Sequence, residues 1–245
     1  MVFVLPIPLP GGGDGRDEIM SRVLIFANGE LPDLEKTRKL LKPDDTILCA
    51  DGGTRHALAL GVSPHFVVGD MDSATQEEIQ RLNQAGIPIE LHPRDKNETD
   101  LELALNRALE QKPSSILIVG ALGGRLDQTL GNISLLSDSR LASLDCRLDD
   151  GVEEVFFCRG HPQVPSPVFC GRIEGERGDL VSLIPWNGAV TGIRTNGLRW
   201  PLNDETLYPD KTRGISNEML ETVAEVNIET GLLLVVHRRL WKGQL

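Results

Sequence analysis

A chain of 245 residues, with 40% hydrophobic and 25% charged residues, is large enough for one large or two modest globular domains. Its formal net charge of -11 argues against a protein that binds nucleic acid through a broad basic face, because phosphate binding depends on clustered Lys and Arg. No stretch approaches the roughly eighteen uninterrupted apolar residues of a membrane span. We therefore expect a soluble protein with neither nucleic acid nor membrane as a partner.

Residues 21–142 alternate short apolar runs with amphipathic segments. The apolar runs predict strands at 22–27, 46–50, 66–70, 87–91 and 115–120. The segments between them have helical spacing of apolar residues and predict helices at 31–41, 54–60, 75–86 and 99–111. This alternation predicts an α/β/α domain built on a parallel sheet.

Residues 143–245 have a different texture, in which short strand-like pieces are separated by Gly, Pro and Asn. The predicted strands are 153–158, 167–175, 179–186, 189–195 and 232–237. They indicate a smaller all-β sandwich or barrel-like domain. The polar, acidic stretch at 138–152 holds the expected boundary, which we place after residue 142.

The cysteines and the first residues indicate the compartment. Residues 1–20 have no basic leader, are interrupted by prolines and glycines, and are expected to form a flexible extension. The cysteines form no CxxC pair, which favours reduced thiols in a cytoplasmic protein over a disulfide scaffold or a zinc site. They are Cys49, Cys146, Cys158 and Cys170.

Four aspartates follow predicted strands: Asp51, Asp70, Asp72 and Asp100. Ligands of open parallel sheets bind at the carboxyl ends of the strands, so these carboxylates are expected to converge on one edge. In an extended backbone Asp70 and Asp72 would point to the same side and repel each other unless water or a divalent cation lay between them. Oxygen ligands of this kind suit Mg²⁺ beside a phosphate.

Each aspartate also has an ordinary structural interpretation. An Asp after a strand is often a turn former or a helix N-cap. The stretches TQEE and TDLE fit the capping-box pattern, with Thr75 and Thr99 as the caps. Four aspartates at successive strand ends nevertheless favour a metal-phosphate site.

Two glycine-rich stretches favour a bound phosphate. DGG at 51–53 opens a helix, and GALGGRLDQTLGN at 120–132 follows the last apolar strand. Glycines let the backbone approach a ligand, but neither a Walker A sequence nor GxGxxG is present. Arg125 is suited to binding phosphate bidentately with Asp127 orienting it, and the alternative is a surface Arg–Asp pair of little energetic weight.

The blocks DGG, GDMDS, DKNETDLELAL, GALGGRLDQTLGNISLL and GLRWPL with GISNE occur in the order and spacing of the thiamine pyrophosphokinase family. From about Val23 to the C-terminus the chain resembles this family. The resemblance implies an N-terminal α/β domain that binds ATP with Mg²⁺, a C-terminal β domain, and a homodimer with thiamine bound between subunits.

The resemblance also implies site residues. The implied Mg²⁺ ligands are Asp51, Asp70, Asp72 and Asp100. The implied ATP-binding residues are Asn28, Gly29, Asp51, Gly52, Lys96, Thr99, Arg125 and Asp127. The implied catalytic residues are Asp72, Asp100 and Arg125, with Asp72 or Asp100 accepting or orienting the hydroxyl proton. The implied thiamine-binding residues, contributed by the partner subunit, are Trp200, Ser216 and Asn217.

Two positions depart from the family pattern. Asn97 stands where many bacterial members have Asp, which removes a carboxylate from that position. Gln128 replaces a common His, which removes a proton-transfer group but keeps hydrogen bonding. Trp200 also has two interpretations: its ring stacks on the cationic ring of thiamine, or it packs in the β-domain core as expected for Trp186 and Trp241.

The predicted reaction is Mg²⁺-dependent transfer of the terminal pyrophosphoryl group of ATP to the hydroxyl of thiamine, which releases AMP. One alternative is a diphosphokinase for another alcohol, such as a hydroxymethyl pterin. A second alternative is a non-catalytic sensor of thiamine diphosphate or nucleotide. A sensor would be expected to have lost an acidic residue of the cluster, and all four are present.

Overall fold

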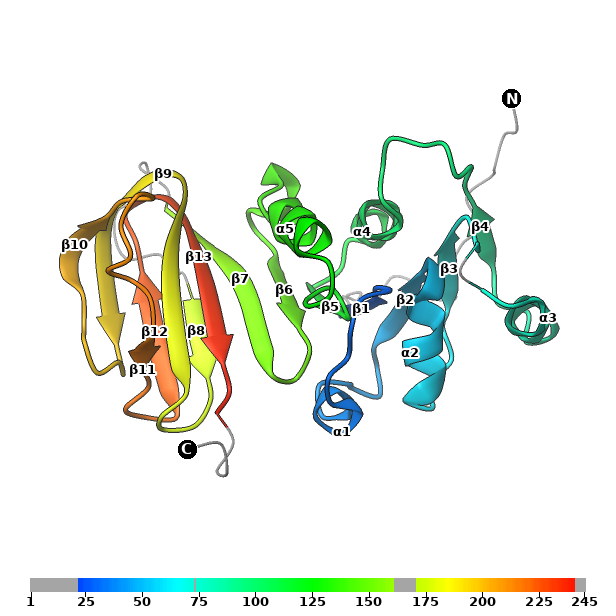
Figure 1. Cartoon of the computed structure of the whole chain (residues 1–245), viewed down its shortest axis with the longest axis horizontal. Coiled ribbons are helices and arrows are strands. Elements are labelled where there is room, and N and C mark those ends of the chain that lie inside the picture. The colour runs from blue at the N-terminus through cyan, green and yellow to red at the C-terminus, as the bar shows by residue number, and fades with distance from the viewer. Residues whose placement is uncertain (1–21, 73, 161–170, 241–245) are drawn as a thin grey trace, which may run out of the picture.

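The computed structural model describes residues 22–72, 74–160 and 171–240, which form an α/β part followed by a β-rich part (Figure 1). The predicted fold class is thereby confirmed. The expected extension at 1–20, together with Cys170 and Trp241, lies outside the described residues.

The α/β part contains five helices of more than one turn and six strands within the described residues. In chain order they are β1 (Val23–Phe26), α1 (Leu34–Arg38), β2 (Thr46–Ala50), α2 (Thr54–Ala59), β3 (Phe66–Gly69), α3 (Gln76–Gln84), β4 (Ile89–Leu91), α4 (Asp100–Glu110), β5 (Ser115–Val119), α5 (Leu126–Leu135) and β6 (Asp145–Asp149). Two single 3₁₀ turns, at Asp51–Gly53 and Ser139–Leu141, connect neighbouring elements. Thr75 and Thr99 cap α3 and α4 as predicted, and Thr75 closes a full capping box with Glu78.

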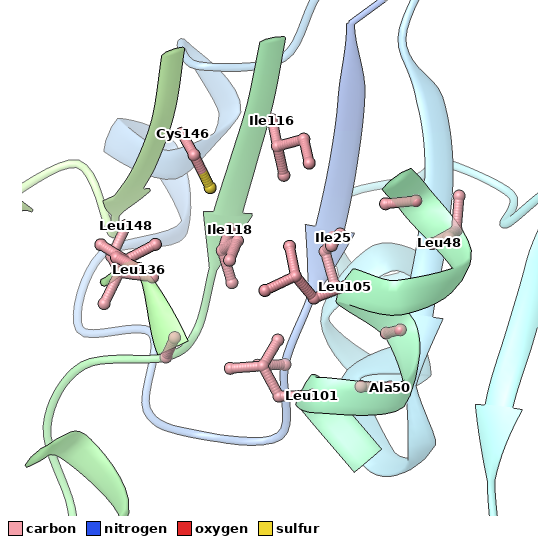
Figure 2. Close-up of a cluster of buried hydrophobic side chains, with 14 of the residues drawn as sticks. Ile25, Leu48, Ala50, Leu101, Leu105, Ile116, Ile118, Leu136, Cys146 and Leu148 are labelled. Atoms are coloured by element: carbon pink, nitrogen blue, oxygen red, sulfur yellow. The ribbon is translucent and has the colours of Figure 1, made fainter. Parts of the chain in front are cut away.

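The strands of this part pair in parallel in the order β4-β3-β2-β1-β5-β6. Successive residues of the central strands face opposite layers. Ile25 packs beneath α4 with Leu101 and Leu105 (Figure 2). Leu24 belongs to the cluster on the other face, with Leu60 of the α2 side. Because both faces of the sheet are covered at its centre, strands β1, β2, β3 and β5 are mostly apolar and buried.

Strand β6 extends the parallel sheet beyond the expected boundary. Its residues pair with β5 from Ser115 opposite Asp145 to Ile118 opposite Leu148. A boundary after residue 142, as expected from the sequence, would assign β6 to the β-rich part. Strand β6 is, however, the last strand of the parallel α/β sheet. Strand β6 then turns back as β7 in an antiparallel pair, which makes the two parts continuous.

The β-rich part is a two-layered antiparallel structure. Its strands are β7 (Glu153–Arg159), β8 (Gly171–Glu174), β9 (Leu180–Asn196), β10 (Asn203–Leu207), β11 (Asn217–Glu218), β12 (Val223–Asn227) and β13 (Thr230–Arg238). One layer contains β7, β13 and the first half of β9; the second half of β9 pairs with β12 and β10. The strands predicted at 179–186 and 189–195 are therefore one long strand shared by both layers.

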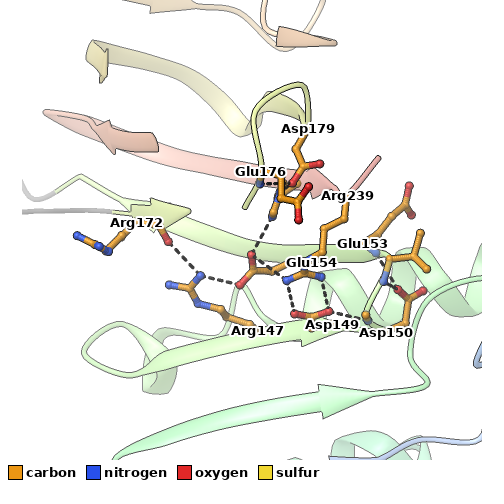
Figure 3. A network of polar contacts seen from close by, with 12 residues as sticks. Arg147, Asp149, Asp150, Glu153, Glu154, Arg172, Glu176, Asp179 and Arg239 are labelled. Atoms are coloured by element: carbon orange, nitrogen blue, oxygen red, sulfur yellow. Dashed lines mark hydrogen bonds and ion pairs between the residues drawn. The ribbon is translucent and has the colours of Figure 1, made fainter. Parts of the chain in front are cut away.

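A buried polar network joins the two parts (Figure 3). Arg239, after β13, makes two hydrogen bonds of 2.8 Å with Asp149 of β6. His237, with no exposed surface, lies between Glu154 Oε2 at 3.2 Å and Asp179 Oδ2 at 3.0 Å. Burial alone would raise the pKa of Glu154, but the hydrogen bond with His237 and the charge of Arg147 hold it below its usual value. The ionised carboxylate therefore ties β6 and β7 to β13.

Three cysteines in the described part of the chain are buried: Cys49, Cys146 and Cys158. Burial raises the pKa of Cys146 to about 12, so this thiol is protonated and unreactive near neutral pH. Among the residues that the structure describes, none of the helices is both long and apolar enough to cross a membrane.

Candidate active site

A cleft of about 720 Å³ opens at the carboxyl edge of the parallel sheet. Its lining comes from the loops after β1, β2, β3 and β5 and from the start of α4. Most of the ATP-side residues expected from the sequence line it: Asn28, Gly29, Asp51, Asp70, Lys96, Thr99, Asp100 and Arg125. Parallel strands bring these loops together although they are far apart in the chain.

Three carboxylates meet inside this cleft. Asp51, Asp70 and Asp100 each offer an oxygen within 4.8 Å of the others. Asp51 is only 4% exposed, and its Oδ1 accepts no hydrogen bond from any described residue. Lys96 Nζ, 2.7 Å from Asp100 Oδ1, offsets one of the three charges. A buried acceptor without a partner among repelling carboxylates fits a site for a divalent cation.

Unusual backbone conformations build the acidic cluster. Asp51 has a φ of 44° and Gly69 a φ of 151°, both rare for residues with a side chain. A Cβ at Gly69 would lie 2.9 Å from Asp51 Cβ and 3.2 Å from Asp100 Oδ1. Glycine is therefore required where the end of β3 passes the two carboxylates.

Gly69→Ala is expected to reduce turnover at least about tenfold while the protein remains folded, because the added methyl displaces Asp51 and Asp100 from each other. The measurement is the steady-state rate at several Mg²⁺ concentrations, with circular dichroism to confirm folding. Gly61→Ala is the matched control, since Gly61 also has a positive φ but has open space around it. Equal rates for Gly69→Ala and Gly61→Ala would contradict the expectation.

Asp72 lies beside the cluster rather than within it. The expected extended backbone is wrong here, because Met71 has a φ of 58° and turns the chain between the two aspartates. The Asp72 amide donates to Asp70 Oδ1 at 3.1 Å, and Asp72 Oδ2 lies 3.5 Å from Arg94 Nε. The roles of Asp72 as metal ligand and proton acceptor stay predictions.

The loops after β1 and β5 are packed backbone to backbone. Gly29 N donates to Gly120 O at 2.7 Å, and a side chain at Gly29 would collide with the same carbonyl. His56 Nε2 donates to Gly29 O at 2.8 Å, and burial lowers the pKa of His56, so the neutral ring supports the loop. Glycine at these positions keeps the floor of the cleft open to a ligand.

Arg125 lies at the cleft and precedes α5. It donates to Asp127 through Nη2 at 2.6 Å and Nε at 3.1 Å. These hydrogen bonds hold the pKa of Asp127 below its usual value, and both side chains are exposed. The Arg–Asp pair expected from the sequence is present, and the role of Arg125 toward phosphate stays a prediction.

Trp200, Ser216 and Asn217 meet at a second cavity, of about 520 Å³, in the β-rich part. Asn217 accepts from Trp200 N at 3.1 Å and donates to Trp200 O at 2.8 Å. Trp200 is 58% exposed, so its interpretation as a core residue is wrong. Trp186 is half-buried and contacts Phe157 edge to face at a centroid distance of 5.5 Å.

The two cavities share no lining residue. In the sheet, strands β6, β7 and β13 separate β5, beside the first cavity, from β9, beside the second (Figure 1). The α/β cleft and the cavity at Trp200 are therefore separate sites within one chain.

Sequence reasoning missed several residues that line the α/β cleft: Glu30, Arg55, Arg94, Glu98 and Asn132. Glu30 and Asn132 lie in or next to blocks already noted for their glycines. Arg55 and Arg94 sit one or two residues from noted motifs, and only the folded loops bring them to the cleft. Two of the predicted ATP-binding residues, Gly52 and Asp127, do not line the cleft; Gly52 lies against Asn28 and Asp127 accepts from Arg125, and both of these partners line it.

Both parts of the chain match known protein families. The family model described as the thiamin pyrophosphokinase catalytic domain matches residues 37–148. The model described as the thiamin pyrophosphokinase vitamin B1 binding domain matches residues 172–233. The first range contains the acidic cluster, and the second contains Trp200 and Asn217.

Comparisons with individual proteins and with solved structures agree with the two family models. A thiamine pyrophosphokinase of Bacillus subtilis is 32% identical over 186 residues, which cover 76% of this chain and 84% of that protein. The crystal structure of the thiamine pyrophosphokinase from Bacillus subtilis has a TM-score of 0.78 at 28% identity and covers 90% of this chain and 100% of that one. The Geobacillus thermodenitrificans structure has a TM-score of 0.75 at 25% identity, covering 91% and 100%.

The fold, the cleft and these matches define a kinase, an enzyme of the transferase class. Its acidic cleft and its second cavity lie in the two parts that the family models match separately. The chain belongs to the thiamine pyrophosphokinase family.

Proposed function

We propose that this enzyme is a thiamine diphosphokinase that transfers the terminal diphosphoryl group of ATP to the hydroxyl of thiamine in a Mg²⁺-dependent reaction. The hydroxyl oxygen forms a bond to the β-phosphorus, the bond from that phosphorus to the α-phosphate oxygen breaks, and AMP leaves. The hydroxyl proton passes to a carboxylate of the site. The products are thiamine diphosphate and AMP.

The acidic cluster is the observation that carries the proposal. A triphosphate and three carboxylates repel each other, so binding ATP beside Asp51, Asp70 and Asp100 requires a cation. Bound Mg²⁺ would neutralise charge on the phosphates during transfer. The Oδ1 of buried Asp51, which accepts no hydrogen bond from the described residues, is suited to holding such an ion.

The remaining residues of the cleft orient the nucleotide. Lys96 lies next to the cluster with a side chain only 11% exposed, which fixes its charge where the transferred phosphates are expected. The Gly29 loop allows close approach of the ligand. Arg125 lines the same cleft and would offset charge that develops on the leaving phosphate. Positioning and charge neutralisation supply most of the rate enhancement in reactions of this type.

We further propose that the active site is completed in a homodimer. Trp200 offers an exposed, electron-rich ring for the cationic thiazolium of thiamine, with Ser216 and Asn217 beside it. Because the Trp200 cavity and the ATP cleft are separate within one chain, thiamine on Trp200 would reach ATP held by a second subunit. A cytoplasmic location follows as a proposal from the cysteine pattern.

The alternative substrates and roles are less well supported. A diphosphokinase for another alcohol would share the α/β cleft, but the β-rich part matches a vitamin B1 binding domain. A non-catalytic sensor would not need the acidic cluster, in which three of the four predicted carboxylates, Asp51, Asp70 and Asp100, come together.

The test is product analysis by chromatography after incubation with ATP, Mg²⁺ and thiamine. Equal amounts of AMP and thiamine diphosphate are expected, without free thiamine monophosphate, because attack at the β-phosphorus transfers both phosphoryl groups together. Chelation of Mg²⁺ by EDTA should stop the reaction. Formation of ADP and thiamine monophosphate would refute the mechanism, and turnover of a hydroxymethyl pterin but not thiamine would refute the substrate.

A further inference from the structure

Four cationic side chains line the α/β cleft, and three of them form ion pairs. The three pairs are Lys96 with Asp100, Arg94 with Asp72, and Arg125 with Asp127. The fourth cation, Arg55, has no ion pair with a carboxylate anywhere in the residues that the structure describes. Among the cationic side chains of the described residues that line the cleft, Arg55 is therefore the one without an ion-pair contact to a carboxylate.

Neutral oxygens hold the Arg55 guanidinium in place. Arg55 Nη2 donates to Asn28 Oδ1 at 2.6 Å, and Nε donates to Gly52 O at 3.3 Å. Asn28 is itself fixed against Gly52, where a side chain would collide with its amide. A guanidinium has five N–H donors, so two fixed contacts leave the others for a ligand in the cleft.

The position of Arg55 relates it to the acidic cluster. It lies in the first turn of α2, which directly follows the 3₁₀ turn that contains Asp51. A cation binding at Asp51 would bring the phosphates that it neutralises to this part of the cleft. We propose that Arg55 is a further substrate-binding residue, whose guanidinium binds the phosphate chain of ATP.

This inference rests on the proposed ATP-dependent function and deepens it. The charges of Lys96, Arg94 and Arg125 are each offset in part by a carboxylate before a phosphate binds. Arg55 exchanges only neutral or water contacts, and its planar fork matches a phosphate bidentately. Its contribution is therefore expected in the affinity for ATP more than in the rate of the bound complex.

The test is calorimetric titration of the full chain with Mg²⁺ and either ATP or inorganic triphosphate, without thiamine. Arg55→Gln is expected to lower the affinity for both ligands at least about tenfold, as for the loss of a hydrogen bond to a charged group. The affinities of Arg55→Lys should lie between those of Arg55→Gln and the wild type, because lysine keeps the charge but not the planar guanidinium fork. Arg81→Gln removes an arginine 73% exposed on α3 and is the matched control, expected to leave both affinities unchanged.

Two results would overturn the inference. Unchanged ATP affinity in Arg55→Gln would show that the guanidinium does not contact the nucleotide. Weaker ATP binding with unchanged triphosphate binding would assign it to the nucleoside instead of the phosphates. Product analysis of the wild type tests the proposed function separately. If the wild type forms AMP and thiamine diphosphate but Arg55→Gln binds both ligands normally, only this inference is refuted. If Arg55→Gln loses affinity for both ligands but the wild type forms no such products, only the proposed reaction is refuted.

Discussion

Asp51→Asn is expected to abolish most turnover while stabilising the metal-free protein. The substitution removes one of three carboxylates whose oxygens lie within 4.8 Å, so repulsion among them falls by an energy of order 1 kcal/mol. The same change removes the buried oxygen charge suited to the cation. Loss of several kcal/mol of charge stabilisation in the transition state lowers the rate by at least about a hundredfold.

Two measurements separate these effects. The melting temperature without Mg²⁺ should rise in Asp51→Asn, and the further increase that Mg²⁺ gives the wild type should disappear, since a ligand stabilises only a state that binds it. Asp44→Asn is the control, because Asp44 is exposed and lies outside the cleft. A variant that keeps both near wild-type rate and the Mg²⁺-dependent increase would leave the acidic cluster with a purely structural role.

The α/β part could be predicted well because its signals are local. Apolar runs of four or five residues between amphipathic segments identify β1, β2, β3 and β5, whose faces are both buried. Strand β6 was missed because DCRLD carries three charged residues. Arg147 of this strand instead pairs with Glu154 of the next strand, and Asp149 pairs with Arg239, which lies 90 residues further along the chain.

The β-rich part was predicted less completely. Strand β10 has the sequence NDETL and lies at the edge of a layer, where polar residues remain exposed and the alternating pattern is weak. The stretch Asn187–Gly188 marks a break between two predicted strands, yet positive φ values at both residues let β9 continue through it. Pairing with β13 and then β12, which no local pattern encodes, decides the outcome.

At the site, residue types and strand ends were enough to predict that Asp51, Asp70 and Asp100 converge. The turn at Met71 was not predictable, because a left-handed methionine between two aspartates has no sequence signature, and it moves Asp72 toward Arg94. The partner-subunit role of Trp200 came only from the family resemblance. Composition alone favoured the core for this residue, whose side chain is in fact exposed.

Mixing two inactive variants is expected to restore activity if the active site is shared between subunits. Asp51→Asn disables the ATP side of a site, and Trp200→Ala removes the ring proposed to stack on thiamine. In a mixed dimer with one variant of each kind, one site carries both defects and the other carries neither. With random exchange of equal amounts about half of the dimers are mixed, so about a quarter of all sites should be intact.

The measurement is the initial rate of thiamine diphosphate formation before and after subunit exchange, with exchange followed by mass spectrometry of differently tagged chains. Recovery toward about a quarter of the wild-type rate is expected, because each intact site combines Asp51 of one chain with Trp200 of the other. Trp186→Ala in place of Trp200→Ala is the control, since Trp186 is half-buried against Phe157 away from both cavities. Because Trp186→Ala chains keep both Asp51 and Trp200, their homodimers are already active before mixing. Subunit exchange with Asp51→Asn should therefore not increase the rate of this control mixture. No recovery for the Trp200 pair despite proven exchange would place Trp200 in the site of its own subunit or remove it from the reaction.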